Sequence, residues 1–144
     1  MNYLVVTIGF ALMGITLEVF WQGLGNLIRK KDLRLIGHSY IWMIPLYGLV
    51  PFIYKTTLSH FQNYSIFFRG LIYMFAFYLL EYIFGFTIKQ LTGRCPWDYS
   101  KHYVKIFGKK RKFHFQKIIT LEYAPVWYIY GILFEFYYLF LIKI

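Results

Sequence analysis

The sequence predicts an all-α integral membrane protein whose four transmembrane helices form a compact bundle. Of its 144 residues, 59% are apolar and only 15% are charged, whereas an average soluble domain has about 45–50% and about 25%. Four apolar stretches reach the length of about 20 residues that a helix needs to cross a bilayer. They are continuous rather than alternating, which excludes the strands of a transmembrane barrel. A helix also satisfies its own backbone groups in lipid.

The four predicted spans form one transmembrane domain over residues 1–144 and cover residues of about 3–28, 39–60, 64–90 and 118–143. The first stretch lacks the positively charged start and the small-residue cleavage site of a secretory signal, so we expect it to remain as a membrane span. Pro45 and Pro51 in the second span and Pro125 in the fourth predict kinks in those helices.

Basic residues between the spans predict the orientation of the chain. The segments 29–38 and 91–117 carry twelve of the sixteen Lys and Arg residues, and with four spans they lie on the same side. Because basic loops stay in the cytoplasm, we expect both segments to be cytoplasmic. Both termini are then extracytoplasmic, in a bacterial-type inner (plasma) membrane. We also expect the basic loops to bind the anionic headgroups of membrane lipids.

Four glutamates and one arginine fall inside the predicted spans: Glu18, Glu81, Glu122, Glu135 and Arg69. A charge in hydrocarbon costs about 2.5–3.5 kcal/mol even on a mild insertion scale, so each of them needs a partner, a proton or a water-filled cavity. With a helical rise of about 1.5 Å per residue, Glu18 and Glu81 lie at matching depths, roughly 15 Å and 14 Å from the cytoplasmic ends of their spans. Arg69 and Glu135 lie in the outer half, where we expect a structural ion pair.

The remaining glutamates have two interpretations. In one, they only hold neighbouring helices together. In the other, Glu18 and Glu81 line a polar cavity that opens to the cytoplasm, where they titrate with an ion or hold a cationic or hydroxylated ligand. Small and polar residues recur around Glu18 at helical spacing, and such a face usually meets other helices. The residues of this predicted intramembrane site are Glu18, Glu81, His38, Glu122 and Gln22.

The sequence predicts no cofactor, no metal site and no catalytic residues. Its four histidines are scattered, its single cysteine excludes an internal disulfide, and it has no phosphate-binding glycine loop, no metalloprotease motif and no dinucleotide fingerprint. The net charge of +10 would suit a nucleic-acid partner in a soluble protein. Here the cations are confined to segments between apolar stretches, so we expect no nucleic-acid partner.

The segment between the third and fourth spans is expected to be a structured cytoplasmic loop. It begins with the motif "GRCPWDYS", residues 93–100. We expect its two large aromatic side chains to lie at the membrane interface, its aspartate to pair with Arg94 or Arg34, its proline to stop the third helix, and the whole motif to close the cytoplasmic end of the bundle. The motif residues that we single out are Arg94, Trp97, Asp98, Tyr99 and Ser100.

Three blocks of sequence carry a resemblance to a known family. "RLIGHSYIWMIPLYGL" (34–49), "GRCPWDYS" (93–100) and "ITLEYAPVWYIYGILFE" (119–135) resemble the small four-span proteins of the putative ABC-transporter type IV (CmpB-like) family. The eukaryotic transmembrane protein 229 family is similar to them. The resemblance marks Glu18, Gly37, His38, Ser39, Trp42, Pro45, Tyr47, Gly48, Glu81, Trp97, Asp98, Tyr99, Ser100 and Trp127. It implies a transport role and a partner ATPase.

Three functions therefore remain open at this point. The first is a transport-related membrane component with a polar intramembrane site built on glutamates. The second is a membrane-embedded enzyme that acts on a lipid or isoprenoid and uses Glu18 and Glu81 as acid and base. The third is a structural or regulatory subunit that binds another membrane protein and has no activity of its own.

Overall fold

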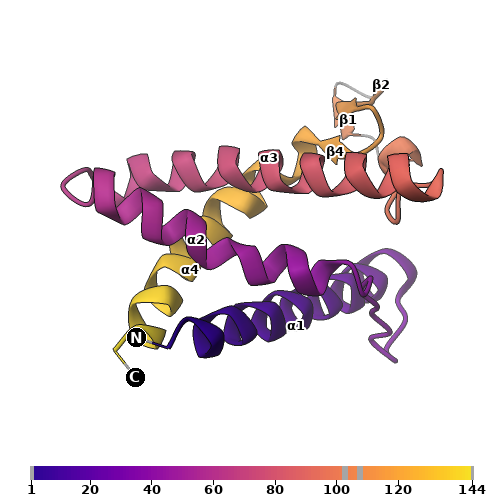
Figure 1. Ribbon diagram of the computed structural model, residues 1–144. Coiled ribbons are helices and arrows are strands. Elements are labelled where there is room, and N and C mark those ends of the chain that lie inside the picture. Colours follow the sequence, from indigo (N-terminus) through magenta and orange to yellow (C-terminus); the bar gives the residue numbers. More distant parts are fainter. Residues whose placement is uncertain (1, 102–103, 107–108, 144) are drawn as a thin grey trace. The chain divides into compact units, whose positions relative to one another are not determined.

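The computed structural model describes residues 2–101, 104–106 and 109–143, and the side chains of residues 2–100 and 112–143. Four α-helices account for most of these residues (Figure 1). They are α1 (Tyr3–Lys30), α2 (Met43–Phe61), α3 (Ile66–Thr92) and α4 (Ala124–Leu141). The chain forms two compact units, one of Met1–Phe52 with Tyr138–Ile144 and the other of Ile53–Tyr137.

Three helical segments in the described part of the chain are long and apolar enough to cross a membrane: Tyr3–Lys30, Ile66–Thr92 and Leu121–Leu141. The second predicted span is also a helix, α2 with 19 residues. It is less apolar than the others because Lys55, Ser59 and His60 lie in its second half. The membrane crossing of α2 therefore stays a prediction.

Two helices begin later than the sequence predicts. Helix α2 begins at Met43 rather than near residue 39, and α4 begins at Ala124 rather than near residue 118. Pro45 and Pro125 consequently lie in the first turns of these helices, where a proline's missing N–H would have no partner in any case. Neither residue requires the predicted kink. Of these three prolines, Pro51 is the one that lies in a helix interior, beyond the first turn.

In the first unit, α1 is followed by a non-helical segment that returns along its surface. Lys31 adopts a left-handed conformation that ends α1, and its N–H donates to the Leu27 carbonyl. We call the following residues 33–42 the strap. The Asn26 side chain donates a 2.7 Å hydrogen bond to the Ile36 carbonyl, which ties the strap to α1. This return is the reason that α2 begins late.

In the second unit, the segment between α3 and α4 contains short ordered elements. Gly93 ends α3 with φ 74° and donates to the Lys89 carbonyl, so the helix stops before Pro96. Two antiparallel hairpins follow, β1 (Val104–Ile106) with β2 (Lys109–Arg111) and β3 (His114–Phe115) with β4 (Ile119–Thr120). Single 3₁₀ turns, η1 (Tyr99–Lys101) and η2 (Leu121–Tyr123), flank them.

Candidate functional site

In the first unit, the carboxylate of Glu18 on α1 is held by two hydroxyl groups. Ser39 of the strap donates to Oε2 over 2.9 Å, and Tyr47 of α2 donates to the same oxygen over 3.4 Å. The other oxygen, Oε1, accepts no hydrogen bond from the described residues and is not among the buried polar atoms. Glu18 is half-buried. The carboxylate is therefore held through one oxygen by the described residues.

Glycine residues make this arrangement possible. A Cβ atom on Gly14, one turn before Glu18, would overlap the ring of Tyr47. A Cβ atom on Gly37 would overlap the backbone oxygen of Val19. The absence of side chains at these two positions lets Tyr47 and the strap approach α1 closely enough to reach the Glu18 carboxylate.

Two other predicted site residues lie in the same unit. His38 precedes Ser39 in the strap, is exposed, and lies near enough to Glu18 to act on its carboxylate electrostatically. Its ring meets the Tyr40 ring edge-on with centroids 6.0 Å apart. Gln22 is half-buried one turn beyond Glu18, and its side chain makes no hydrogen bond to a described residue.

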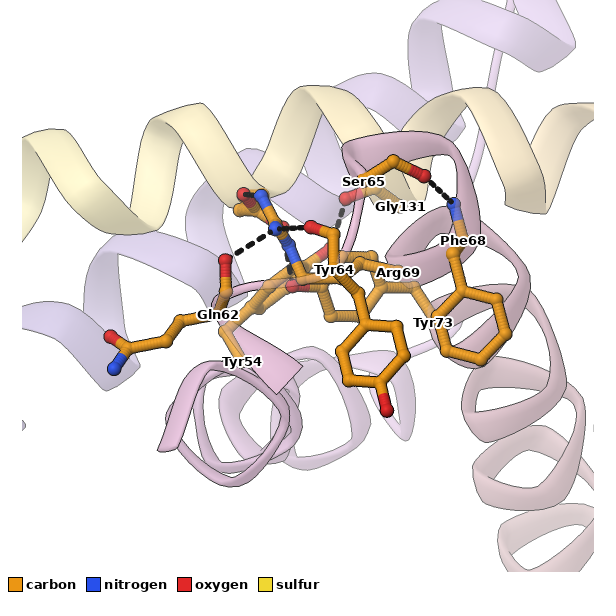
Figure 2. A network of polar contacts seen from close by, with 9 residues as sticks. Tyr54, Gln62, Tyr64, Ser65, Phe68, Arg69, Tyr73 and Gly131 are labelled. Carbon is orange, nitrogen blue, oxygen red and sulfur yellow. Dashed lines mark hydrogen bonds and ion pairs between the residues drawn. The ribbon is translucent and has the colours of Figure 1, made fainter. Parts of the chain in front are cut away.

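The second unit contains a buried polar network around Arg69 and Glu135, which Figure 2 shows from close by. Arg69 Nε donates to Glu135 Oε2 over 2.8 Å and Nη2 donates to Oε1 over 2.5 Å. The Tyr73 hydroxyl donates to Oε2 over 2.5 Å. The exposed fractions of the Arg69 and Glu135 side chains are 12% and 2%. These two residues, expected to pair, are thus in bidentate contact.

Arg69 also holds the turn between α2 and α3. Its Nη1 donates to the carbonyls of Gln62 and Tyr64, over 3.1 Å and 2.5 Å (Figure 2). Nearby, the Tyr54 hydroxyl donates to the Gly131 carbonyl over 2.9 Å. Because all three guanidinium nitrogens and both carboxylate oxygens have protein partners, this network has the character of a structural clamp rather than of a ligand site.

Glu81, the second predicted site glutamate, is buried on α3 with 4% of its surface exposed. It accepts a 2.6 Å hydrogen bond from the Tyr99 hydroxyl. The Tyr99 ring in turn meets the ring of Tyr123, which follows half-buried Glu122 in η2. The segment after α3 thus reaches back to a carboxylate on that helix. The proposed joint site of Glu18 with Glu81 stays a prediction.

The motif at residues 93–100 is folded against α3. Trp97 is 5% exposed and its Nε1 donates to the Ile118 carbonyl over 3.0 Å, so it packs within the protein, and its depth at the membrane interface stays a prediction. Gly85 on α3 makes room for Trp97 and Ile118. Burial raises the pKa of the Cys95 thiol above its usual value.

Asp98 and Arg34 have different contacts from those expected. Asp98 accepts hydrogen bonds from the backbone N–H and the hydroxyl of Ser100, over 2.8 Å and 3.0 Å, and so caps the 3₁₀ turn. Arg34 pairs with Asp32 over 2.9 Å. For exposed Arg94, the described contacts are those of its backbone with Thr92.

Tyr73 is the hydroxyl-bearing site member that sequence reasoning missed, whereas Ser39, Tyr47 and Tyr99 were named without these contacts to the glutamates. Tyr73 follows Arg69 by four residues on α3, a spacing that places both on one face, so the helical pattern could have indicated it. The link between Tyr99 and Glu81 has no such local signal, because it joins a loop to a helix eighteen residues earlier.

Comparison with known proteins gives one family and no structural relative. The sequence pattern of the family described as "Putative ABC-transporter type IV" matches residues 5–143. No solved structure matches the chain. The match together with three helices of spanning length and apolarity indicates a multi-pass integral membrane protein.

Proposed function

The chain belongs to the putative ABC-transporter type IV family, and on that premise we propose that it is a small membrane component of a transport system. The chain has no phosphate-binding glycine loop of its own. In this proposal, ATP hydrolysis is therefore the task of a partner subunit, and this chain supplies the membrane part. The name of the family supports the transport role, and the arrangement around Glu18 supports a site for it.

The proposed topology has four spans, because it counts α2 as a span in addition to the three apolar segments. The segments rich in Lys and Arg then lie in the cytoplasm and both termini lie outside. The single cysteine makes a direct test possible. In a Cys95→Ser background, Lys30→Cys and Lys112→Cys should react with a membrane-impermeant maleimide only in inside-out vesicles. Asn63→Cys should react only in right-side-out vesicles. If positions 30, 63 and 112 were labelled from the same side, the four-span topology would be wrong.

The proposed site rests on one observation: only one oxygen of the Glu18 carboxylate accepts hydrogen bonds from described residues. A carboxylate inside a span needs a partner, and such residues usually mark the path of an ion or substrate. Ser39 and Tyr47 orient Glu18 through one oxygen, and among the described residues no cationic side chain lies within ion-pair distance of it. The free oxygen can accept a proton, a metal cation or a donor group of a hydroxylated or cationic ligand. Glu135, by contrast, is saturated by Arg69 and Tyr73.

Flux measurements with matched variants test this site. Inside-out vesicles that contain the full chain would be loaded with a pH-sensitive dye and exposed to ATP and to Na⁺ or K⁺. We expect Glu18→Gln to remove the pH-dependent flux while the protein stays folded. Asp32→Asn makes the same carboxylate-to-amide change outside the spans and should leave the flux intact. Equal flux in the wild-type chain and Glu18→Gln would refute the site, as would a loss that only follows the amount of folded protein.

A further inference from the structure

The strap contacts α1 through four successive parts of its backbone and side chains. Ile36 contacts Asn26, Leu35 lies against Gly23, Gly37 lies against Val19, and Ser39 reaches Glu18. These contacts lie between residues 18 and 26 of α1, which is about 12 Å of helix at a rise of about 1.5 Å per residue. The strap therefore lies against residues in the C-terminal half of α1 with non-helical backbone.

The side chains of the strap are unusually exposed for their chemistry. Leu33 is 84% exposed, Ile41 is 76%, Ile36 is 50% and Trp42 is 44%. The polar contacts of the strap run to α1 while these apolar side chains point away from the first unit's core. Several exposed apolar side chains in one short segment indicate a contact with a membrane or with another protein.

Cations border this apolar surface. Arg29, Lys30 and Lys31 are exposed at the end of α1 and make no ion pair with a described residue. Arg34 is already neutralised by Asp32. Exposed apolar side chains beside unpaired cations fit the boundary between acyl chains and anionic headgroups, where tryptophan is also enriched.

The length of α1 places the strap at that boundary. Its 28 residues extend about 42 Å, whereas the hydrocarbon core of a bilayer is about 30 Å thick. An excess of about 12 Å corresponds to about the last eight residues of α1, which include the strap contacts at Gly23 and Asn26. The polar residues Gln22, Asn26 and Arg29 lie at this end of α1, so this end is the one that extends beyond the hydrocarbon.

We propose that the strap is an interfacial membrane-binding element that takes anionic phospholipids. Its apolar side chains enter the part of the acyl chains next to the headgroups, and Arg29, Lys30 and Lys31 bind the phosphate groups of these headgroups. The bilayer is a better occupant than a protein because the surface continues directly from a spanning helix and carries unpaired cations at the correct height. The inference does not depend on the transport role, since it uses neither Glu18 chemistry nor a partner ATPase.

The test places a fluorescent label on the strap of the full chain in nanodiscs. Ile41→Cys and, as a second strap position, Leu33→Cys would be labelled in the Cys95→Ser background, with Asn63→Cys in the α2–α3 turn as the reference. The nanodiscs would hold phosphatidylcholine alone or with an equal amount of phosphatidylglycerol. Quenching would be measured with a lipid that carries a nitroxide high on its acyl chain and with aqueous iodide.

We expect the strap labels to be quenched by the nitroxide lipid and shielded from iodide, and more so with phosphatidylglycerol. The triple change Arg29→Gln, Lys30→Gln and Lys31→Gln should weaken the preference for phosphatidylglycerol by roughly a hundredfold, since each cation contributes about fivefold. The matched triple change at Lys109, Lys110 and Arg111 should leave the strap labels unchanged.

Three results would overturn the proposal. Iodide could reach residue 41 as readily as residue 63, which would place the strap in water. The strap labels could be shielded from both quenchers, which would mean that a second copy or another protein covers them. They could also contact lipid equally with and without phosphatidylglycerol, which would refute the anionic headgroup.

Discussion

Removal of one partner from the Arg69–Glu135 pair should strongly destabilise the second unit. In Glu135→Gln, the amide cannot balance the guanidinium charge, which stays 12% exposed. Three donors lose an anionic acceptor: Arg69 Nε, Arg69 Nη2 and the Tyr73 hydroxyl. Breaking a buried ion pair from one side costs about 3–5 kcal/mol. We therefore expect the folding equilibrium constant to fall by a factor of about a hundred to several thousand.

A double-mutant cycle separates the pair from its surroundings. Arg69→Met should cost at least as much as Glu135→Gln, because Arg69 also donates to the carbonyls of Gln62 and Tyr64. The combination of Arg69→Met with Glu135→Gln removes both charges. It should be less destabilising than the sum of the single changes by about 1–3 kcal/mol. Arg69→Lys keeps the charge but loses the bidentate geometry, so it should fall between wild type and Arg69→Met.

The assay is reversible unfolding of the full chain in mixed micelles with increasing sodium dodecyl sulfate. Circular dichroism follows the helices, and tryptophan fluorescence follows all four tryptophans, of which Trp97 and Trp127 lie in the second unit. Asp32→Asn, which alters an exposed pair, is the matched control and should change stability by less than about 1 kcal/mol. If Glu135→Gln were as stable as this control, or if the double change were additive, the clamp would not contribute as inferred.

Three further predictions concern separate contacts. Gly14→Ala should cost about 1–3 kcal/mol of unfolding free energy, because the added Cβ overlaps the Tyr47 ring. A thermal scan would measure this cost, with Gly25→Ala as the control because a Cβ atom there meets open space. Equal midpoints for the two variants would contradict the prediction. Tyr99→Phe should cost about 1.5–3 kcal/mol of unfolding free energy, because buried Glu81 loses a charge-assisted hydrogen bond. If residues 93–100 of this variant resisted proteases as well as they do in the wild-type chain, the Tyr99–Glu81 contact would not hold this segment. Cys95 should react slowly with iodoacetamide at neutral pH, since burial raises the pKa of its thiol and the thiolate is the nucleophile. Its rate should therefore keep rising with pH beyond the value at which a free-cysteine standard levels off, and identical profiles would refute the shift.

Much of the helical organisation is readable from the sequence because lipid imposes a simple rule. Continuous apolar stretches of spanning length locate α1, α3 and α4 to within a few residues at most ends. The contact of Arg69 with Glu135 is also readable, since a lone cation inside an apolar stretch requires an acid at a similar depth. Local helical spacing and transfer energetics suffice for both inferences.

The strap and the loop contacts could not be read in this way. The strap depends on close backbone approach at Gly23 and Gly37, and a glycine in a sequence does not reveal which chain will approach it. The hairpins between α3 and α4 lie in a lysine-rich segment with little alternation of apolar and polar residues, so no strand period marks them. The burial of Trp97 depends on space that Gly85 leaves on α3, which is a tertiary effect.

Native mass spectrometry of the tagged full chain, ejected directly from its own membrane, tests the central claim most directly. A transport component should emerge in a complex whose mass includes an ATP-hydrolysing subunit, and addition of ATP with a non-hydrolysable analogue as the control should alter that complex. A chain that emerges only by itself or only as copies of itself, with no ATP-dependent change in any complex, would contradict the proposed function.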